Sequence, residues 1–262
     1  MKLGISMASL YPMPSEECLE LLGKAGVENT EFFCNCQSEL SDEFVRELIK
    51  IKNYYGINIL SLHPYTSGYE PYLLSRKYPR RYNDTLDLYK KYAEVAAKLG
   101  ANILVLHGDR PMERDKMPEY FEHFAKMSHV IEREGIMLTQ ENVRKFCASD
   151  PEFIRAMIDY LGNRAMFTFD VKQSIRSGVS PWEVYDAMRG HIAHIHLSDN
   201  NSEKDCMLPS RGDFPFEKLF RIAISDGFDG GALIEVYENA YATEMQLIDS
   251  YKSLVKRYET LL

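Results

Sequence analysis

The sequence predicts an α/β protein that folds as a single-domain (β/α)8 TIM barrel over residues 1–262. Three observations lead to this fold class. Short apolar runs alternate with segments of helical periodicity, glycines recur between them every 27 to 44 residues, and no long Pro-, Gly- or Ser-rich linker divides the chain. One strand-plus-helix unit takes about 30 residues, and eight such units fill a barrel of about 250 residues.

Eight short apolar runs are the predicted strands. They are almost continuously apolar, as strands are when helices cover a parallel sheet on its outer face. They span residues 3–7, 28–33, 58–63, 102–107, 137–142, 166–170, 192–197 and 232–237. A glycine precedes each strand from the second to the eighth and suits the left-handed position that ends a helix; these are Gly26, Gly56, Gly100, Gly135, Gly162, Gly190 and Gly227.

The segments between these runs carry helix signals. Residues 82–99 have apolar side chains at helical spacing and end at Gly100. Residues 180–183 form a capping box with proline at the first helical position, and Asp150-Pro151 is a similar start. An open doubly wound sheet is the alternative fold, but it ordinarily carries a Gly-rich phosphate loop, and the sequence contains neither GxGxxG nor GxxxxGK[ST].

Charge and composition narrow the class of protein. Lys and Arg number 31 against 39 Asp and Glu, a net charge of −8, which disfavours a nucleic-acid or anionic-lipid partner. No window approaches the roughly 18 consecutive apolar residues of a membrane span, and the first residues do not resemble a secretory signal. The five cysteines are scattered and odd in number, so we expect reduced thiols and a cytoplasmic protein.

Residues that bind metals or transfer protons stand at the C-terminal ends of the predicted strands. From the third strand on they are His63, His107, Glu141, Asp170, His196 and Glu235, and Glu31 is comparable on the second strand. A buried carboxylate is costly unless it is paired or coordinated, and in a barrel these strand ends meet at one mouth. A lone histidine there is more often structural, but the set of oxygen and nitrogen donors suits Mn²⁺, Mg²⁺, Co²⁺ or Zn²⁺.

The chain resembles the xylose-isomerase-like TIM barrel superfamily of sugar isomerases, sugar 3-epimerases and endonuclease-IV-type nucleases. The matching segments occur in the order found in that superfamily: SLHPY (61–65), VLHGD (105–109), TQEN (139–142), FDVKQSIRSG (169–178), HIHLSD (194–199), LPSRGDFPF (208–216) and ALIEVY (232–237). The resemblance implies one divalent ion, Mn²⁺ before Mg²⁺, Co²⁺ or Zn²⁺, with four ligands: Glu141, Asp170, His196 and Glu235. His194 shares a strand face with His196, and we expect it to be a polar core residue.

This resemblance implies a metal-dependent sugar isomerase or epimerase with a small-molecule sugar substrate. Glu141 and Glu235 would be the acid/base pair that moves a proton next to a carbonyl, through a metal-bound enediolate. His63 and His107 would bind substrate hydroxyls. Arg211 stands in a loop similar to the family's PGxGxxDF stretch and would bind a hydroxyl, carboxylate or phosphate.

The chain departs from the family pattern at three positions. Ser210 stands where the family usually has glycine, which leaves the path of the Arg211 loop open. Lys172 and Gln173 follow Asp170, whereas some family members have a histidine at the position of Gln173 near the substrate. A non-catalytic sugar-binding barrel and an inosose-type dehydratase, in which the same enediolate expels a β-hydroxyl, remain alternatives.

The strongest alternative is an endonuclease-IV-like hydrolase of abasic DNA. In it, His63, His107 and Glu141 would hold one zinc, and the four-residue set a second. Gln173 replaces a histidine of the third zinc site, and residues 197–216 lack the Asp-x-His of that family. Residues 65–82 interleave tyrosines with basic residues that could contact nucleic acid, namely Arg76, Lys77, Arg80 and Arg81; we expect this loop to be a lid or a homo-oligomer contact instead.

Overall fold

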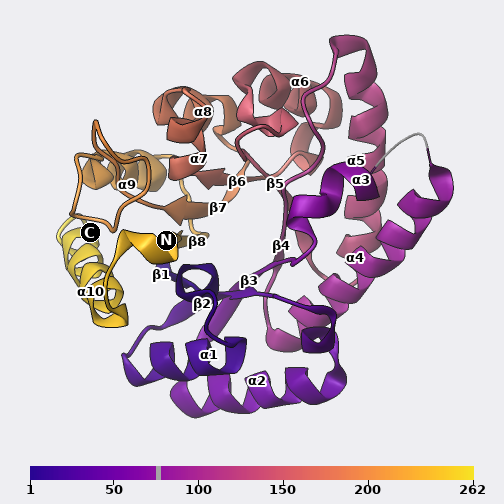
Figure 1. Ribbon diagram of the computed structural model, residues 1–262. Coiled ribbons are helices and arrows are strands. Elements are labelled where there is room, and N and C mark those ends of the chain that lie inside the picture. The colour runs from indigo at the N-terminus through magenta and orange to yellow at the C-terminus, as the bar shows by residue number, and fades with distance from the viewer. Residues whose placement is uncertain (75–77) are drawn as a thin grey trace.

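A closed barrel of eight parallel strands forms the centre of the computed structural model, which describes residues 1–74 and 78–262 (Figure 1). The strands follow each other in chain order, and β8 pairs with β1 to close the barrel. They are β1 (Lys2–Ser6), β2 (Asn29–Phe33), β3 (Asn58–His63), β4 (Ile103–Leu106), β5 (Met137–Glu141), β6 (Phe167–Asp170), β7 (Ile192–Leu197) and β8 (Gly231–Ile234). The predicted fold class is therefore confirmed.

Helices surround the barrel on all sides (Figure 1). They are α1 (Ser15–Lys24), α2 (Asp42–Tyr55), α3 (Glu70–Leu73), α4 (Pro79–Leu99), α5 (Met117–Glu132), α6 (Pro151–Leu161), α7 (Val171–Arg176), α8 (Pro181–Met188), α9 (Phe216–Ser225) and α10 (Glu244–Glu259). Short 3-10 helices are η1 (Met7–Leu10), η2 (Gln37–Leu40), η3 (Ser67–Tyr69), η4 (Arg114–Lys116), η5 (Cys147–Ser149), η6 (Gly162–Arg164) and η7 (Glu238–Ala240). No helix in the described part of the chain has the length and apolarity that crossing a membrane requires.

The predicted strands are confirmed, with ends displaced by three residues or fewer. Two predicted strand-end residues, His107 and Glu235, lie just beyond β4 and β8. The Glu235 amide still donates to the Leu197 carbonyl at 2.9 Å, so this residue stays attached to the barrel rim. The predicted capping glycines have positive φ; Gly56, at φ 72°, ends α2 and donates its amide to the Lys52 carbonyl.

The predicted helix starts are confirmed, with one correction. Asp150 caps α6 by accepting a hydrogen bond from the Glu152 amide at 2.9 Å. Ser180 occupies the N-cap of α8, but its side chain makes no capping hydrogen bond, so the predicted capping box is wrong in that respect. The Ser180 carbonyl instead accepts the Glu183 amide at 3.0 Å, and Pro181 fixes the first turn.

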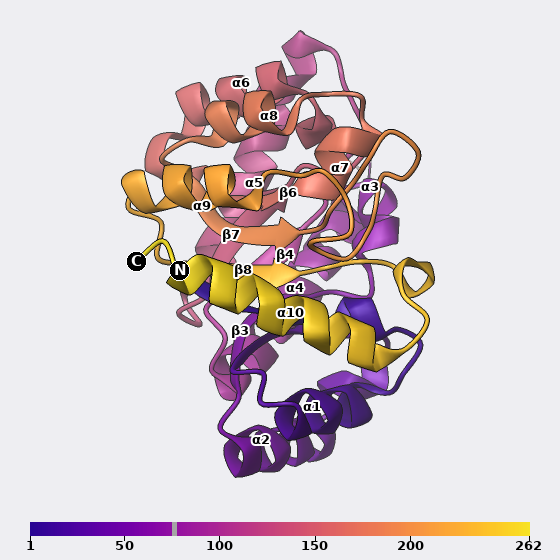
Figure 2. The ribbon, with the colours of Figure 1, turned by 90° about the vertical axis from the view of Figure 1, so that its left-hand side faces the viewer.

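The two ends of the chain lie together at one end of the barrel (Figure 2). The Met1 amino group donates to the Tyr258 hydroxyl at 3.0 Å, so α10 is joined to the start of β1. This is the end at which the strands begin. The side chains predicted to be functional all lie at the other end, where the parallel strands finish.

Candidate active site

Four side chains from different strands converge at the C-terminal end of the barrel. Glu141 ends β5, Asp170 ends β6, His196 lies near the end of β7, and Glu235 follows β8. One ligand atom from each lies within 4.8 Å of those of the other three. The structure therefore brings together the four residues that the sequence analysis selected, although more than 90 residues separate the first from the last.

His196 lies at the centre of this group. Its Nδ1 atom is 2.7 Å from Glu235 Oε2, 3.2 Å from Glu141 Oε1 and 3.7 Å from Asp170 Oδ2. One imidazole N–H cannot serve three carboxylates. Within the described residues, Glu141 Oε2 and Glu235 Oε2 are buried and make no hydrogen bond of normal geometry. Three carboxylates gathered around one imidazole nitrogen form a buried set of oxygen and nitrogen donors within 4.8 Å of one another, and this donor set fits a divalent metal ion.

Glu31 lies on the other side of the His196 ring. Its Oε2 atom is 3.3 Å from His196 Nε2 and also accepts a hydrogen bond from Ser61 at 2.8 Å, while Ser6 donates to Oε1 at 2.9 Å. Burial alone would raise the pKa of Glu31, but the charges of His196, His63 and His194 outweigh it and lower the pKa to about 2. Glu31 is thus a buried carboxylate that holds His196.

His194 lies deeper in the barrel than His196. It is fully buried, its Nε2 atom is 3.3 Å from the Ser61 hydroxyl, and burial together with the neighbouring His196 lowers its pKa to about 4. These contacts agree with the predicted polar core residue.

His63 and His107 contact each other and Glu141. Their Nε2 atoms are 3.0 Å apart, and Glu141 Oε2 lies 3.1 Å from His107 Nε2 and 3.6 Å from His63 Nε2. Burial lowers the pKa of His107. Burial would also lower the pKa of His63, but the hydrogen bond and charge of Glu141 and the charge of Glu31 outweigh it and raise that pKa to about 8. The His107 side chain is 18% exposed, compared with 5% or less for His63 and Glu141, so it is the part of this trio that reaches the open mouth.

The xylose isomerase-like TIM barrel family matches residues 19–253, nine-tenths of the chain. The chain belongs to this family.

Relatives and solved structures agree with this assignment. An uncharacterised protein of Mycobacterium tuberculosis is 24% identical over 260 residues, which cover 90% of this chain and 88% of that protein. A D-tagatose 3-epimerase-like protein superposes with a TM-score of 0.78 at 19% identity, covering 100% of this chain and 98% of the other. IolI, crystallised with a zinc atom, superposes with a TM-score of 0.78 at 16% identity, covering 98% of each chain.

Lys172 is a site residue that the sequence analysis did not select in this xylose isomerase-like barrel. Its side chain is buried, and its Nζ atom donates to Asp170 Oδ2 and, at 2.8 Å, to Glu235 Oε1. Burial alone would lower the pKa of Lys172, but the charges of Asp170, Glu235 and Glu141 raise it well above its usual value. The signal in the sequence was a lysine two residues after the predicted ligand Asp170.

Gln173 has a structural role in this member of the family. Its side-chain oxygen accepts a hydrogen bond from the Arg144 backbone amide at 3.1 Å. Its backbone amide donates to Asp170 Oδ1 at 3.0 Å. Asn142 supports the same segment, because it accepts from the Asp170 amide at 2.7 Å and donates to the Asp170 carbonyl at 2.9 Å. These bonds hold Asp170 in place, with Oδ1 committed to the start of α7.

The loop that carries Arg211 follows a defined path. Asp199 accepts the amides of Gly212 and Phe214 at 2.9 and 2.8 Å, and Ser210 has a φ of 70°, a left-handed conformation that favours the glycine usual in this family. Arg211 is exposed on this loop. Within the described residues its guanidinium makes no hydrogen bond or ion pair with the cluster of Glu141, Asp170, His196 and Glu235. Its role in binding substrate stays a prediction.

Residues 65–82, the segment rich in tyrosines and basic residues, expose several tyrosine rings to solvent. Of its basic residues, Arg76 and Lys77 lie outside the described residues, and Arg80 is exposed. Arg81 donates to the Tyr72 carbonyl at 3.2 Å and lies 5.2 Å from the centre of the Tyr78 ring. This arginine is engaged within its own loop.

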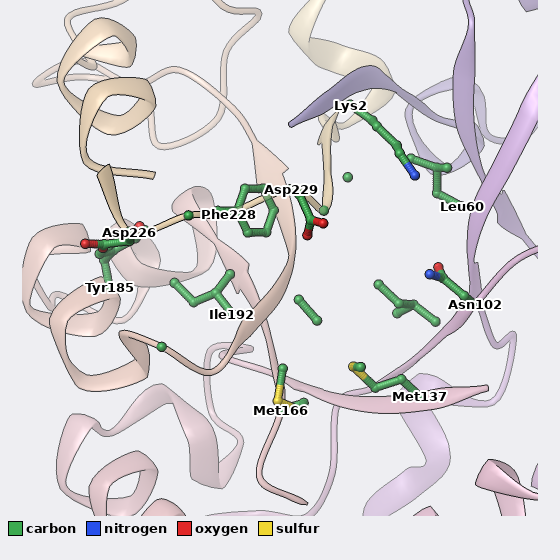
Figure 3. Close-up of a pocket in the computed structure, with 16 residues that line it drawn as sticks. Lys2, Leu60, Asn102, Met137, Met166, Tyr185, Ile192, Asp226, Phe228 and Asp229 are labelled. Carbon is green, nitrogen blue, oxygen red and sulfur yellow. Dashed lines mark hydrogen bonds between the residues drawn. The ribbon is translucent and has the colours of Figure 1, made fainter. Parts of the chain in front are cut away.

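A separate cavity of about 330 Å³ lies at the opposite end of the barrel (Figure 3). Lys2, Met137 and Ile192, the first residues of β1, β5 and β7, line it. It therefore has no part in the site at the strand ends.

Proposed function

We propose that this chain is a metal-dependent sugar epimerase or aldose–ketose isomerase that moves a proton next to a carbonyl group. The observation that carries the proposal is the placement of Glu141 and Glu235 on one histidine, with Nδ1 of His196 3.2 Å from Glu141 Oε1 and 2.7 Å from Glu235 Oε2. Glu141 ends β5 and Glu235 follows β8, so the two carboxylates come from separate places on the barrel rim. Carboxylates that flank a substrate from two sides can remove a proton from one face of a carbon atom and return it to the other.

Glu141, Asp170, His196 and Glu235 would hold the divalent ion, and Mn²⁺ suits this set of three carboxylates and one imidazole. When bound, such an ion supplies Lewis-acid polarisation of the substrate carbonyl. The burial of Glu141 excludes bulk water from the carboxylate that carries the proton.

Side chains of the protein would transfer the proton and bind the substrate. The carboxylates of Glu141 and Glu235 would hold the moving proton, each on one of its oxygen atoms. His107, at the open side, and His63 behind it would donate hydrogen bonds to substrate hydroxyls. Arg211 would bind an anionic or hydroxyl group farther from the carbonyl.

A solvent-deuterium exchange screen across ketoses, aldoses and inososes, with Mn²⁺ present, tests the proposal. We expect deuterium at a carbon next to the carbonyl of one substrate class, which NMR or mass spectrometry locates. Loss of a hydroxyl in the product would assign the dehydratase reaction instead. No exchange in any class, together with no bound metal, would favour a non-catalytic sugar-binding barrel.

An endonuclease-IV-like hydrolase is the second candidate. It is favoured by the trio His63, His107 and Glu141, whose ligand atoms also lie within 4.8 Å of one another. The charge of −8 opposes DNA binding, and the Gln173 side chain is bonded to the Arg144 amide. Titration of the protein with abasic duplex at low salt tests it, because phosphate contacts are strongest there; no binding removes this candidate.

We also infer a cytoplasmic protein that forms homo-oligomers. All five cysteines are free, which agrees with a reducing compartment. Tyr69, Tyr72 and Tyr78, in the loop after β3, are more than half exposed and offer a contact surface for a second copy. Sedimentation of the purified protein tests the oligomeric state.

A further inference from the structure

Lys172 occupies the candidate cation site from inside the protein. Its side chain is 1% exposed, and its ammonium contacts two of the four proposed metal ligands, Asp170 and Glu235. A buried ammonium is costly unless it is paired. Its position is therefore determined by the carboxylates that a divalent ion would also use.

Lys172 and a divalent ion would compete for a single atom, Asp170 Oδ2. Asp170 Oδ1 accepts the Gln173 amide at 3.0 Å and caps α7, so Oδ2 is the oxygen that Asp170 has left to offer a metal. This oxygen is 3.7 Å from His196 Nδ1, and it is the one to which Lys172 donates. Glu235 has no such conflict, because Lys172 uses its Oε1 atom while Oε2 lies 2.7 Å from His196.

Tyr237 offers the ammonium a second contact, on a ring whose centre also lies 5.3 Å from the Arg176 guanidinium. The Tyr237 ring centre lies 5.8 Å from Lys172 Nζ, and aromatic faces attract ammonium groups. Tyr237 also lines an open pocket of about 600 Å³, together with Arg176 and Cys206. A shift toward Tyr237 would release Asp170 Oδ2 and keep the bond to Glu235 Oε1.

We propose that Lys172 is an internal cation of this site, which pairs with Asp170 and Glu235 in the metal-free protein and which a divalent ion must displace from Asp170 Oδ2 in order to bind. This rests on the proposed function, since it concerns the same ligand set. The geometry supports it, because an ammonium that stayed at hydrogen-bond range from Asp170 Oδ2 would repel a divalent ion bound to the same oxygen. Lys172 thus sets the affinity of the site for its metal.

The test compares Mn²⁺ affinity, by calorimetric titration after removal of metal with a chelator, in the natural protein and in Lys172→Met and Lys172→Gln. We expect both variants to bind Mn²⁺ at least tenfold more tightly. Lys204→Met is the matched control, because it removes one positive charge from an exposed residue that lines the same pocket as Tyr237. Its affinity should stay within twofold of the natural value. Equal or weaker binding by the Lys172 variants overturns the proposal.

A measurement on the natural protein covers the case in which the variants do not fold. With ¹⁵N-labelled lysine, the metal-free protein should show one ammonium resonance protected from solvent exchange, and saturation with diamagnetic Mg²⁺ should shift or remove it. An unchanged resonance at saturation overturns the proposal. If neither the natural protein nor the variants bind a divalent ion, the proposed function fails along with the inference, whereas equal tight binding overturns the inference alone.

Discussion

Glu31 Oε2 lies 3.3 Å from His196 Nε2, on the side of the ring opposite to the Nδ1 atom that lies 2.7 Å from Glu235 Oε2. A carboxylate behind a metal-binding histidine fixes the orientation of the ring and the nitrogen that carries its proton. Ser6 and Ser61 hold Glu31 in turn, so the position of His196 depends on β1, β2 and β3 as well as on its own strand.

Glu31→Gln should therefore weaken metal binding without touching the metal. We expect an affinity for Mn²⁺ lower by about 10- to 100-fold, the effect typical of losing such a partner. Calorimetric titration measures it. Glu39→Gln is the control, because Glu39 is also a buried glutamate with two hydrogen bonds but lies away from the cluster. An unchanged affinity in Glu31→Gln would show that His196 needs no support from β2.

Bound metal should stabilise the fold, because the ion neutralises carboxylates that are close together only in the folded state. At a Mn²⁺ concentration 100 times the dissociation constant, the gain is about 2.7 kcal/mol, which raises the melting temperature of a chain of this size by several degrees. Asp170→Asn should abolish most of this rise. Asparagine still caps a helix, and Lys172 keeps its bond to Glu235 Oε1. Calorimetry of the variant with and without Mn²⁺ gives the metal-dependent rise separately from any change in the stability of the metal-free fold. A full Mn²⁺ shift in this variant would exclude Asp170 as a ligand.

The barrel and the position of polar residues on its rim could be predicted from periodicity, whereas the choice of four ligands among these residues came from the family resemblance. Parallel strands begin after a helix-ending glycine and finish at a common rim, so Glu141, Asp170 and His196 had to meet once eight strands were recognised. Lys172 could not be placed in this way. It is the second residue of α7, and only the fold shows that its long side chain turns inward to Asp170 and Glu235.

The contact between Glu31 and His196 could not be predicted from the sequence either. The two residues lie 165 positions apart, and their contact depends on the depth at which each side chain enters the barrel. Arg211 is the opposite case: similarity to a family loop predicts its role, but an exposed side chain adopts a position that local sequence does not determine.

Glu141→Gln and Glu235→Gln should separate proton transfer from metal binding. If each carboxylate serves one face of the substrate, each variant should interconvert epimers at least about 100-fold more slowly. Each should still exchange deuterium into one epimer, and the epimer should differ between the two variants. The screen described above measures both rates, with Glu39→Gln as the control. Loss of all exchange in step with loss of bound Mn²⁺ would instead make both residues ligands alone.

Glu70, outside the cluster, should make the stability of the fold depend on pH. It is fully buried, and its carboxyl group accepts hydrogen bonds from the Tyr89 hydroxyl and the Gly108 amide. Burial raises the pKa of Glu70 to about 8, and these two hydrogen bonds oppose that rise only in part. The native state therefore holds one proton more than the unfolded chain, in which a glutamate has a pKa of about 4.3.

Between these two pKa values, of about 4.3 in the unfolded chain and about 8 in the folded protein, the free energy of unfolding should fall as the pH rises. The fall is up to about 1.4 kcal/mol for each pH unit. Glu70→Gln has no proton to lose. Its side-chain oxygen can accept from the Gly108 amide as Glu70 does, and its NH2 group can donate to the Tyr89 hydroxyl oxygen, in place of the hydrogen bond that Glu70 accepts from Tyr89. We expect this variant to match the natural protein at pH 5 and to be more stable by a few kcal/mol at pH 8. Urea unfolding at both pH values measures the difference, and parallel pH profiles would mean that Glu70 is already ionised in the folded protein.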